Sequence, residues 1–260
     1  MSAGPPVLPE PELLALKRDL GDGYARFARR CSRGEGILHP GGGLGIGGEA
    51  FPDLNWGDTW GPRWDEAFRL FVARLRERGL PGVLSTMAGV GDEAAGLARE
   101  LGIGEAAAVV PFMVCPRERA RADRAGLVCR RLEPGDAEAA DVIWTEAFEP
   151  PPGVMAAMMG PAFFSAPDVS FWAAEVEGRM AAVACGIRIG DTGGIYAVGT
   201  LPELRRRGAG GAAVSAAMEH LAGIGVTTFA LQASDIGRPV YERLGFRTEA
   251  QVTLWAIPEA

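Results

Sequence analysis

The chain has 260 residues, a formal net charge of −7, 48% hydrophobic residues and 23% charged residues. This composition is too apolar for an intrinsically disordered protein, and the negative charge argues against general binding to nucleic-acid phosphates. The length allows one large domain or two small ones, since a domain typically contains about 100 to 200 residues.

The first twenty residues contain prolines and acidic residues, where a secretory signal would need a basic start and an apolar run. No stretch approaches the roughly 18 uncharged apolar residues needed to cross a bilayer. The four cysteines lie far apart without C-x-x-C spacing, and the chain has only two histidines. We therefore expect a cytoplasmic protein with no membrane segment, no bound metal and no disulfide framework.

The first motif in chain order is GGGLGIGG at 41–48, in which Gly43, Gly45 and Gly48 match the G-x-G-x-x-G spacing of dinucleotide-binding loops. Such a loop holds phosphates because a helix begins directly behind it. Here the residues after the motif contain Pro52 and more glycines and show no helical stripe. The motif itself contains no arginine or lysine. We therefore predict a flexible hairpin turn and no nucleotide site.

An amphipathic helix is predicted at 63–78, because Trp64, Phe68, Phe71, Val72 and Leu75 recur on one helical face. The ten residues NWGDTWGPRW that lead into it are predicted to form a loop. A strand at 82–88, a helix at 92–101 and a strand at 106–114 follow.

A basic and polar stretch at 115–126 has no apolar stripe and separates two segments that each end on an apolar, strand-like run. We predict a linker at 116–126 between one domain at 1–115 and another at 127–260.

The second segment alternates between helical and strand-like patterns. The pattern predicts a strand at 126–132, a helix at 136–148 capped by Asp136, and a short helix at 154–164. Three apolar runs at 169–201, broken at EGR and GDTGG, are typical of an antiparallel meander. A glycine-rich helix from Gly208 to about Ala222, a strand at 226–233, a short helix ending at Leu244 and a strand at 251–257 complete an α+β domain.

The ends of the two segments can be aligned, with 97–114 placed over 240–257. Leu101-Gly102-Ile103 then matches Leu244-Gly245-Phe246. A helix that stops at a glycine before a strand is common, so the alignment alone is weak evidence. Together with the shared order of elements, it favours an internal duplication.

The strongest chemical signal is TLPELRRRGAGGAAV at 200–214, where a strand, an arginine-rich turn and a glycine-rich helix follow one another. The N–H groups at a helix N-terminus bind anions, and glycine lets a phosphate approach them closely. The helix dipole contributes only about 0.3–1 kcal/mol, whereas each charge-assisted hydrogen bond from an arginine contributes about 1.5–3 kcal/mol. The pattern predicts a site for a polyanion.

These residues resemble a known family. Arg205-x-x-Gly208-x-Gly210 resembles the R/Q-x-x-G-x-G/A loop with which the GNAT acyltransferase superfamily holds the pyrophosphate of acetyl-CoA. The stretch LQASDIGRPVYERLGFR at 231–247 is similar to the strand, short helix and Tyr-x-x-x-Gly-Phe ending of that family. The two blocks stand in the family's order and spacing, and the resemblance covers about residues 127–258.

The resemblance implies an α+β (mixed α/β) fold of two GNAT-like domains, each a mostly antiparallel, splayed sheet flanked by helices. The first domain would be a degenerate copy with a structural role or a part in shaping the acceptor cleft, because Ala98 aligns with Tyr241 and its loop lacks R-x-x-G-x-G. Trp56, Trp60 and Trp64 would line that cleft or, in the simpler interpretation, pack in turns and core.

The resemblance also implies an acetyl-CoA site in the second domain. Backbone groups of Val198, Gly199 and Thr200 would pair with the pantetheine arm as an added strand. Ser234 loosely matches a polar residue near the cofactor in many members. The pyrophosphate would be surrounded, mainly through main-chain amides, by Arg205, Arg206, Arg207, Gly208, Ala209, Gly210 and Gly211.

Tyr241 matches the tyrosine that many members use to protonate the departing thiolate. The chemistry is consistent with this role, because a phenol with a pKa of about 10 can donate a proton to a thiolate whose conjugate acid has a pKa near 8.5. The simpler alternative is an aromatic side chain packed in the core with its hydroxyl at the surface.

No general base can be assigned from the sequence. Glu146, Glu149 and Glu175 are candidates, as is a chain of water molecules, but no spacing selects among them, and each acid is also explained as a solvated surface group. His220 lies late in the glycine-rich helix, where it could simply favour the C-terminal end of the helix dipole.

The acceptor pocket of the family is formed largely by the helical region before the meander. In this chain the region is rich in aromatic residues and methionine, which suggests an apolar, adaptable wall, although core packing explains the same residues. The residues concerned are Trp144, Phe148, Met155, Met158, Met159, Phe163 and Phe164.

Two functions remain after this reasoning. The first is an N-acyltransferase that transfers acetyl from acetyl-CoA by direct attack of an amine on a small molecule or peptide. The second is a non-catalytic acyl-CoA-binding or partner-binding protein that retains the fold. The family also leads us to expect a homodimer, with no nucleic acid, membrane or metal as partner.

Overall fold

The computed structural model describes residues 8–151, 154 and 161–259, which form two compact units. Unit 1 contains the described residues up to Met113, together with Gln232–Ser234 and the described residues from Thr248. Unit 2 contains Val114–Leu231 and Asp235–Arg247, without the undescribed positions. Both units combine helices with a sheet, so the predicted α+β class is confirmed. No helix of the described residues is long and apolar enough to cross a membrane.

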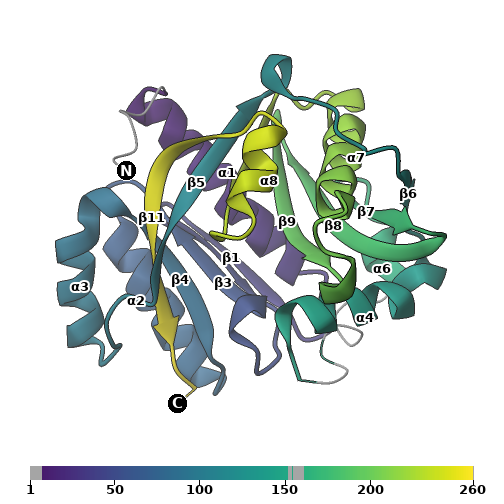
Figure 1. The fold of residues 1–260 in the computed structure, drawn as a ribbon. Helices are drawn as coiled ribbons and strands as arrows, with labels where there is room; N and C mark the ends of the chain where they lie inside the picture. The colour runs from purple at the N-terminus through teal and green to yellow at the C-terminus, as the bar shows by residue number, and fades with distance from the viewer. Residues whose placement is uncertain (1–7, 152–153, 155–160, 260) are drawn as a thin grey trace. The chain divides into compact units, whose positions relative to one another are not determined.

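Unit 1 has the strand order β1-β2-β3-β4-β11-β5 (Figure 1). Strands β3 and β4 are parallel, whereas β1 with β2, β2 with β3, and β11 with β4 are antiparallel. The elements are α1 (Glu10–Ala28), β1 (Glu35–His39), β2 (Gly42–Ile46), β3 (Asn55–Thr59), α2 (Trp64–Glu77), β4 (Gly82–Met87), α3 (Gly91–Glu100), β5 (Ala108–Pro116) and β11 (Arg247–Ile257).

Helix α2 forms where the apolar stripe predicts it and buries that stripe. Phe68, Phe71 and Leu75 are 0% exposed and pack with Leu44 and Trp255 in one hydrophobic cluster. Burying one such side chain contributes about 1.5–3 kcal/mol, so this face accounts for much of the stability of unit 1.

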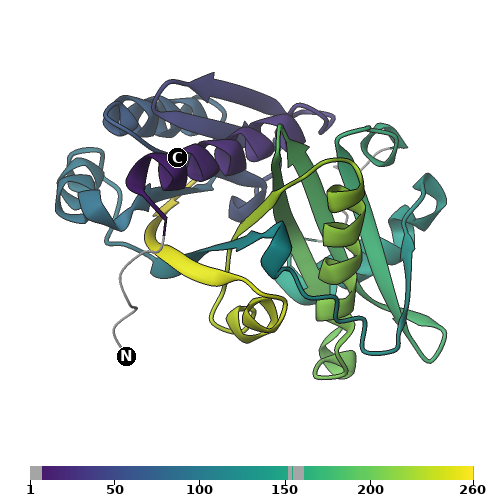
Figure 2. The ribbon, with the colours of Figure 1, turned by 90° about the horizontal axis from the view of Figure 1, so that it is seen from above.

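The prediction of a flexible hairpin turn at GGGLGIGG is wrong. Residues Gly42–Ile46 form β2, which is completely buried and pairs with β1 on one side and β3 on the other. A Cβ at Gly43 would lie 2.4 Å from the backbone carbonyl carbon of Gly21, and one at Gly45 would lie 2.3 Å from the carbonyl oxygen of Tyr24. The glycines therefore let α1 pack directly on the strand, as Figure 2 shows from above.

The predicted loop NWGDTWGPRW also contains a strand, β3, and the tryptophans in and just after this strand pack within unit 1. Trp56 stacks on Tyr24 with ring centroids 5.5 Å apart. Trp60, just after the strand, is 8% exposed and lies against Gly21.

Lys17, the only lysine in the sequence, projects from α1 into the interior of unit 1. Its side chain is 0% exposed and is paired with the carboxylate of Asp58 on β3 and with the hydroxyl of Ser85 on β4. Gln232 donates a further hydrogen bond of 2.7 Å to Asp58 Oδ1. Burial lowers the pKa of Lys17 below its usual value, although Asp58 opposes this change. The helix is thus bound to the sheet by a buried charged group.

The last strand, β11, lies in unit 1. Val252 is paired with Met87, and the antiparallel register continues to Ile257 opposite Gly82. Trp255 and Ile257 are buried in the unit 1 cluster. Unit 2 therefore differs from the predicted segment 127–260, because β11 gains its partner and its apolar contacts from β4 rather than from its neighbours in sequence.

Unit 2 has the strand order β10-β9-β8-β7-β6, antiparallel except for the parallel pair β9 and β10. The predicted meander is confirmed as β7, β8 and β9. The elements are β6 (Val128–Arg131), α4 (Ala137–Phe148), α6 (Pro161–Phe164), β7 (Val169–Val176), β8 (Arg179–Ile189), β9 (Thr192–Thr200), α7 (Ala209–Gly223), β10 (Thr228–Gln232) and α8 (Arg238–Arg243).

Helices α7 and α4 cover opposite faces of the unit 2 sheet. Gly186 and Gly193 lie against Leu221 of α7, whereas Gly199 lies against Ile143 and Ala147 of α4. Residues of the predicted linker pack along the same unit, since the N–H of Arg117 donates to the carbonyl of Thr227 and the N–H of Arg121 to that of Leu244. The predicted short helix at 154–164 is described only at Val154 and over α6; the remainder lies outside the described residues.

Candidate functional site

The segment from the end of β9 to the first turn of α7 contains nearly all of the predicted cofactor residues. After β9, Pro202–Leu204 form a single 3-10 turn. The backbone then turns through Arg206 with φ 63° and Gly208 with φ 83°. Gly208 is the N-cap of α7, and this left-handed conformation is one that glycine adopts without steric cost.

The N-terminus of α7 is open to a ligand. No side chain of the described residues caps it, so the first amide groups of the helix, at Ala209, Gly210 and Gly211, have no cap to bond. A Cβ at Gly210 would lie 2.9 Å from the hydroxyl of Thr200, which explains why glycine is needed there. The geometry is that of an anion site at a helix start.

The three arginines before this helix end are exposed. Arg207 Nη1 lies 2.7 Å from Glu177 Oε1, in the turn between β7 and β8. Arg205 Nε donates a long hydrogen bond of 3.4 Å to the carbonyl of Thr200. Within the described part of the chain, the side chain of Arg206 has no such partner. Because exposed ion pairs contribute only about 0–1 kcal/mol, the Arg207 pair can be exchanged for a phosphate.

Strand β9 contains a β-bulge that the sequence did not reveal. Val183 pairs with Gly199 and Cys185 with Tyr196, so two residues of β9, Ala197 and Val198, face one residue of β8. Ala197 has φ 48°, which is uncommon for a residue other than glycine. A bulge bends its strand, and in the described residues β10 pairs with β9 only over Thr192–Gly194.

Beyond Gly194, β10 no longer pairs with β9 among the residues that the structure describes. The predicted residues Val198, Gly199 and Thr200 all lie in this part of β9. An extended ligand that contains amides can add to an open strand edge as a strand does.

Tyr241 lies in α8 and is 9% exposed. Burial raises the pKa of its hydroxyl to about 12. Its ring meets that of Phe246 edge to face, with centroids 5.9 Å apart. The neighbouring Val240 contacts the first turn of α7, where a Cβ at Gly211 would lie 3.4 Å from Val240 Cγ1. Tyr241 is thus adjacent in sequence to a residue that contacts the glycine-rich helix.

Ser234 lies in a different compact unit from the 198–211 segment and Tyr241. It is exposed, follows β10 and belongs to unit 1, whereas the loop and Tyr241 belong to unit 2. Its predicted contact with a cofactor stays a prediction.

The candidate bases do not converge on one residue. Glu175 accepts a hydrogen bond of 3.0 Å from Arg130, whereas Glu146 and Glu149 are exposed. His220 lies near the C-terminal end of α7, and its ring is 5.7 Å from that of Trp172. Burial, with Arg131 as a second cause, lowers the pKa of His220. None of these groups is selected as a base.

The aromatic residues predicted as an acceptor wall form part of the unit 2 core. Trp144, Phe163 and Phe164 surround Phe171 at centroid distances of 5.6, 5.8 and 5.2 Å and are at most 6% exposed. Phe148 is half-buried. Met155, Met158 and Met159 lie outside the described residues. The contacts of the three buried rings are those of core packing.

Sequence reasoning missed a contact between one of these rings and the bulge. The indole Nε1 of Trp144 donates a hydrogen bond of 2.8 Å to the carbonyl oxygen of Ala197. No local pattern signals such a bond; a tryptophan on a helix before the meander is the only hint.

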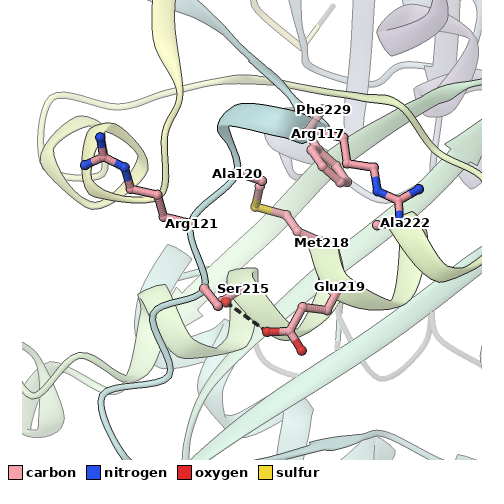
Figure 3. A pocket seen from close by; sticks show the side chains of 9 residues that line it. Arg117, Ala120, Arg121, Ser215, Met218, Glu219, Ala222 and Phe229 are labelled. Atoms are coloured by element: carbon pink, nitrogen blue, oxygen red, sulfur yellow. Dashed lines mark hydrogen bonds between the residues drawn. The ribbon is translucent and has the colours of Figure 1, made fainter.

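A pocket lies elsewhere in unit 2, between the 117–122 stretch and the outer side of α7 (Figure 3). Ser215, Met218, Glu219, Arg117 and Phe229 line it, and Ser215 is hydrogen-bonded to Glu219. Figure 3 shows the side chain of Arg121 directed away from it. None of the predicted cofactor residues lines this pocket. The described residues also contain no group of three or more His, Cys, Asp or Glu side chains placed to hold a metal.

Comparisons with known proteins bear on this geometry. The profile of the acetyltransferase (GNAT) family matches residues 138–246. A comparison with curated proteins gives no match. The chain is similar to the solved structure of a GCN5-related N-acetyltransferase from Kribbella flavida, with a TM-score of 0.69 and 17% identity, over 94% of this chain and 96% of that one.

Two further solved structures are similar over nearly the whole of this chain. One is a protein from Novosphingobium aromaticivorans assigned to the GNAT acetyltransferases, with a TM-score of 0.60, 15% identity, and coverage of 94% of this chain and 98% of that one. The other is a GCN5-related glucosamine N-acetyltransferase region of a fungal multi-domain β-N-acetylglucosaminidase, with a TM-score of 0.58, 14% identity, and coverage of 95% and 36%. At these identities the structures show a GNAT-like fold alone, and the family profile matches less than half of the chain.

Proposed function

We propose that the chain is an N-acyltransferase that transfers acetyl from acetyl-CoA to an amine. The proposal starts from the GNAT-like fold and from the match of the GNAT family profile to residues 138–246. The observation that carries the proposal is the open, uncapped start of α7 beside the part of β9 that does not pair with β10. A pyrophosphate and an amide-containing arm are the two chemical groups that these features would bind.

The residues of unit 2 fit such a donor in two places, and the resemblance to the family adds Ser234. The first amides of α7 and the guanidinium of Arg206 would hold the pyrophosphate, with Arg205 and Arg207 beside it. Backbone groups of Val198–Thr200 would pair with the pantetheine amides. Ser234, on the loose match noted above, would contact the cofactor from the end of β10.

The reaction forms a C–N bond between the acceptor amine and the acyl carbon and breaks the C–S bond of the thioester. The amine loses a proton, and the departing sulfur gains one. Tyr241 would supply that proton or, with a pKa of about 12, donate a hydrogen bond to the developing thiolate. The proton lost by the amine would pass to solvent directly or through water, since no side chain is selected to receive it.

A second candidate function is a non-catalytic acyl-CoA-binding protein or partner-binding protein. Two observations favour it: no base is selected, and Tyr241 is 9% exposed and packed on Phe246. The two functions share the donor site and differ in turnover.

The test of the proposal is release of free thiol from acetyl-CoA over a panel of acceptor amines. The panel contains small aliphatic amines, aminoglycosides, amino acids, peptides and glucosamine, the last because of the fungal relative. Turnover with any member supports the enzyme. Acetyl-CoA binding without turnover across the whole panel favours the non-catalytic acyl-CoA-binding protein. No binding at millimolar acetyl-CoA contradicts both the enzyme and the acyl-CoA-binding protein and leaves the partner-binding protein.

The arginines give a direct test of the donor site. Changing Arg206→Ala together with Arg207→Ala is expected to weaken acetyl-CoA binding at least about tenfold, because each removes a charge-assisted hydrogen bond to phosphate. The measurement is the increase in melting temperature caused by acetyl-CoA, which falls as the dissociation constant rises. Arg188→Ala is the matched control, since that half-buried arginine lies at the end of β8 away from the β7–β8 turn, where its Nε donates to the carbonyl of Gly190. Equal shifts in the double variant and the wild type would place the phosphates elsewhere.

We also propose that 1–115 is a degenerate GNAT-like copy, 116–126 a linker and 127–260 the acetyltransferase copy, whose last strand, β11, belongs to unit 1 in the folded chain. The aligned ends of the two segments form the same elements, helix then strand, as α3 with β5 and α8 with β11. Ala98, which aligns with Tyr241, is 0% exposed and carries no acid or base. We further propose that the protein is cytoplasmic and forms a homodimer. Size-exclusion chromatography with light scattering would test the number of chains in the assembly.

A further inference from the structure

We infer that Trp144 is a positioning residue that holds the β9 bulge in the conformation that binds the amide arm of an acyl-CoA. The inference rests on the proposed function and adds a residue in α4 to the donor site. Trp144 would act through the backbone of β9 and would not touch the donor itself.

Ala197 has an unfavourable backbone conformation, with φ 48°. A non-glycine residue in the left-handed region persists only where its surroundings hold it. The hydrogen bond of 2.8 Å from Trp144 Nε1 to the Ala197 carbonyl is a contact to that same residue. It stabilises the strained conformation from outside the strand.

The indole of Trp144, which donates this hydrogen bond, is held rigidly. Trp144 is 0% exposed, and its ring meets that of Phe171 at an interplanar angle of 76°. Helix α4 approaches β9 closely at Gly199, where a Cβ would lie 3.2 Å from Ala147 Cβ and 3.5 Å from Trp144 Cδ1. The indole is therefore fixed by packing on several sides, so its N–H has one direction.

The hydrogen bond to the Ala197 carbonyl also sets the direction of the Val198 N–H. A trans peptide is planar, and its C=O and N–H point in opposite directions. Because the Ala197 carbonyl points to Trp144 on α4, the N–H of Val198 points away from α4. Trp144 thereby sets the orientation of the Val198 N–H, a hydrogen-bond donor in the part of β9 that does not pair with β10.

The alternative is that Trp144 only fills the core. In that case its N–H would matter for stability and would have no effect on the donor site. The two cases separate when the N–H is removed without removing the ring.

The experiment uses two variants of the full chain: Trp144→Phe, and replacement of Trp144 by benzothienylalanine, which keeps the bicyclic shape and lacks the N–H. Phe171→Leu is the matched control, because it disturbs the same aromatic cluster without removing the indole N–H, which α4 and Gly199 still hold from their side. Two quantities are measured: the dissociation constant of acetyl-CoA, and amide hydrogen exchange at 196–200 in the free protein.

Loss of one neutral hydrogen bond is expected to weaken acetyl-CoA binding about 3- to 10-fold in both Trp144 variants and to speed exchange at 196–200. Phe171→Leu is expected to lower the melting temperature with acetyl-CoA affinity within about twofold of the wild type. If the wild type binds acetyl-CoA and both Trp144 variants bind it equally well, the inference is overturned while the proposed function stands. If the wild type binds no acetyl-CoA, both are overturned, whatever the exchange data show.

Discussion

Replacing Tyr241 with phenylalanine is expected to lower the rate of thiol release about 100-fold or more while acetyl-CoA affinity changes less than about twofold. A positioned proton donor contributes typically about 10²–10⁴ in rate, and phenylalanine keeps the ring that packs against Phe246. The measurements are turnover with an acceptor found in the panel and the dissociation constant of acetyl-CoA. Unchanged turnover would leave Tyr241 as a core aromatic.

The pH dependence of the wild type gives a second check on the same residue. Burial raises the pKa of Tyr241 to about 12, so the hydroxyl remains protonated at pH 10, where an ordinary tyrosine is half ionised. Activity that needs the protonated form is lost only as pH rises through the raised pKa. Turnover between pH 8 and 10 is therefore expected to show no decline from this group, and a decline with a midpoint near 10 would contradict the assignment.

Replacing Lys17 with methionine is expected to reduce the free energy of unfolding by about 3–5 kcal/mol. The change leaves the carboxylate of Asp58 in the interior without its cation, and an unpaired buried charge is far more costly than a buried pair is beneficial. The measurement is chemical denaturation followed by circular dichroism. Two-state unfolding has to be checked, because the chain contains two compact units.

The matched control is Lys17→Met combined with Asp58→Asn. The amide removes the unpaired charge and still accepts from Ser85 and Gln232, so most of the lost stability is expected to return. A double variant as unstable as the single one would assign the loss to packing of the lysine chain.

The pKa of Lys17 adds a signed pH dependence to this comparison. Because burial lowers the pKa below 10.5, the unfolded chain holds the Lys17 proton more tightly than the folded one. The Lys17 contribution to the free energy of unfolding therefore rises with pH in the alkaline range and levels off above about 10.5. Lys17→Met is expected to lack this rise.

What the sequence predicted well depends on local chemistry. The stripe of Phe68, Phe71 and Leu75 and the glycine at the start of α7 each fix a structure through residues a few positions apart. The meander followed from apolar runs separated by turn residues. Each of these signals lies within a short stretch of the sequence.

What the sequence missed depends on distant contacts. Helix α1 was not predicted; its buried face mixes Leu13 and Leu20 with Lys17 and glycines, so it lacks a continuous apolar stripe. The glycines of β2 resembled a phosphate loop, although their purpose is to admit α1. β11 was predicted as a strand, but β4, one of its two neighbours in the sheet, lies about 170 positions earlier. The carbonyl of Ala197 in the bulge accepts a hydrogen bond from Trp144 on α4, which is also distant in sequence.

The burial of Lys17 has a chemical consequence for a protein proposed to hold a reactive thioester. Lysine amines on protein surfaces are common targets of acylation, and this chain has one lysine, whose side chain is 0% exposed. The folded protein therefore presents no lysine amine to the acyl donor it would bind. No exposed lysine side chain competes with the acceptor for acetyl groups, and a thiol-release assay on the folded protein has no background from self-acetylation of lysine.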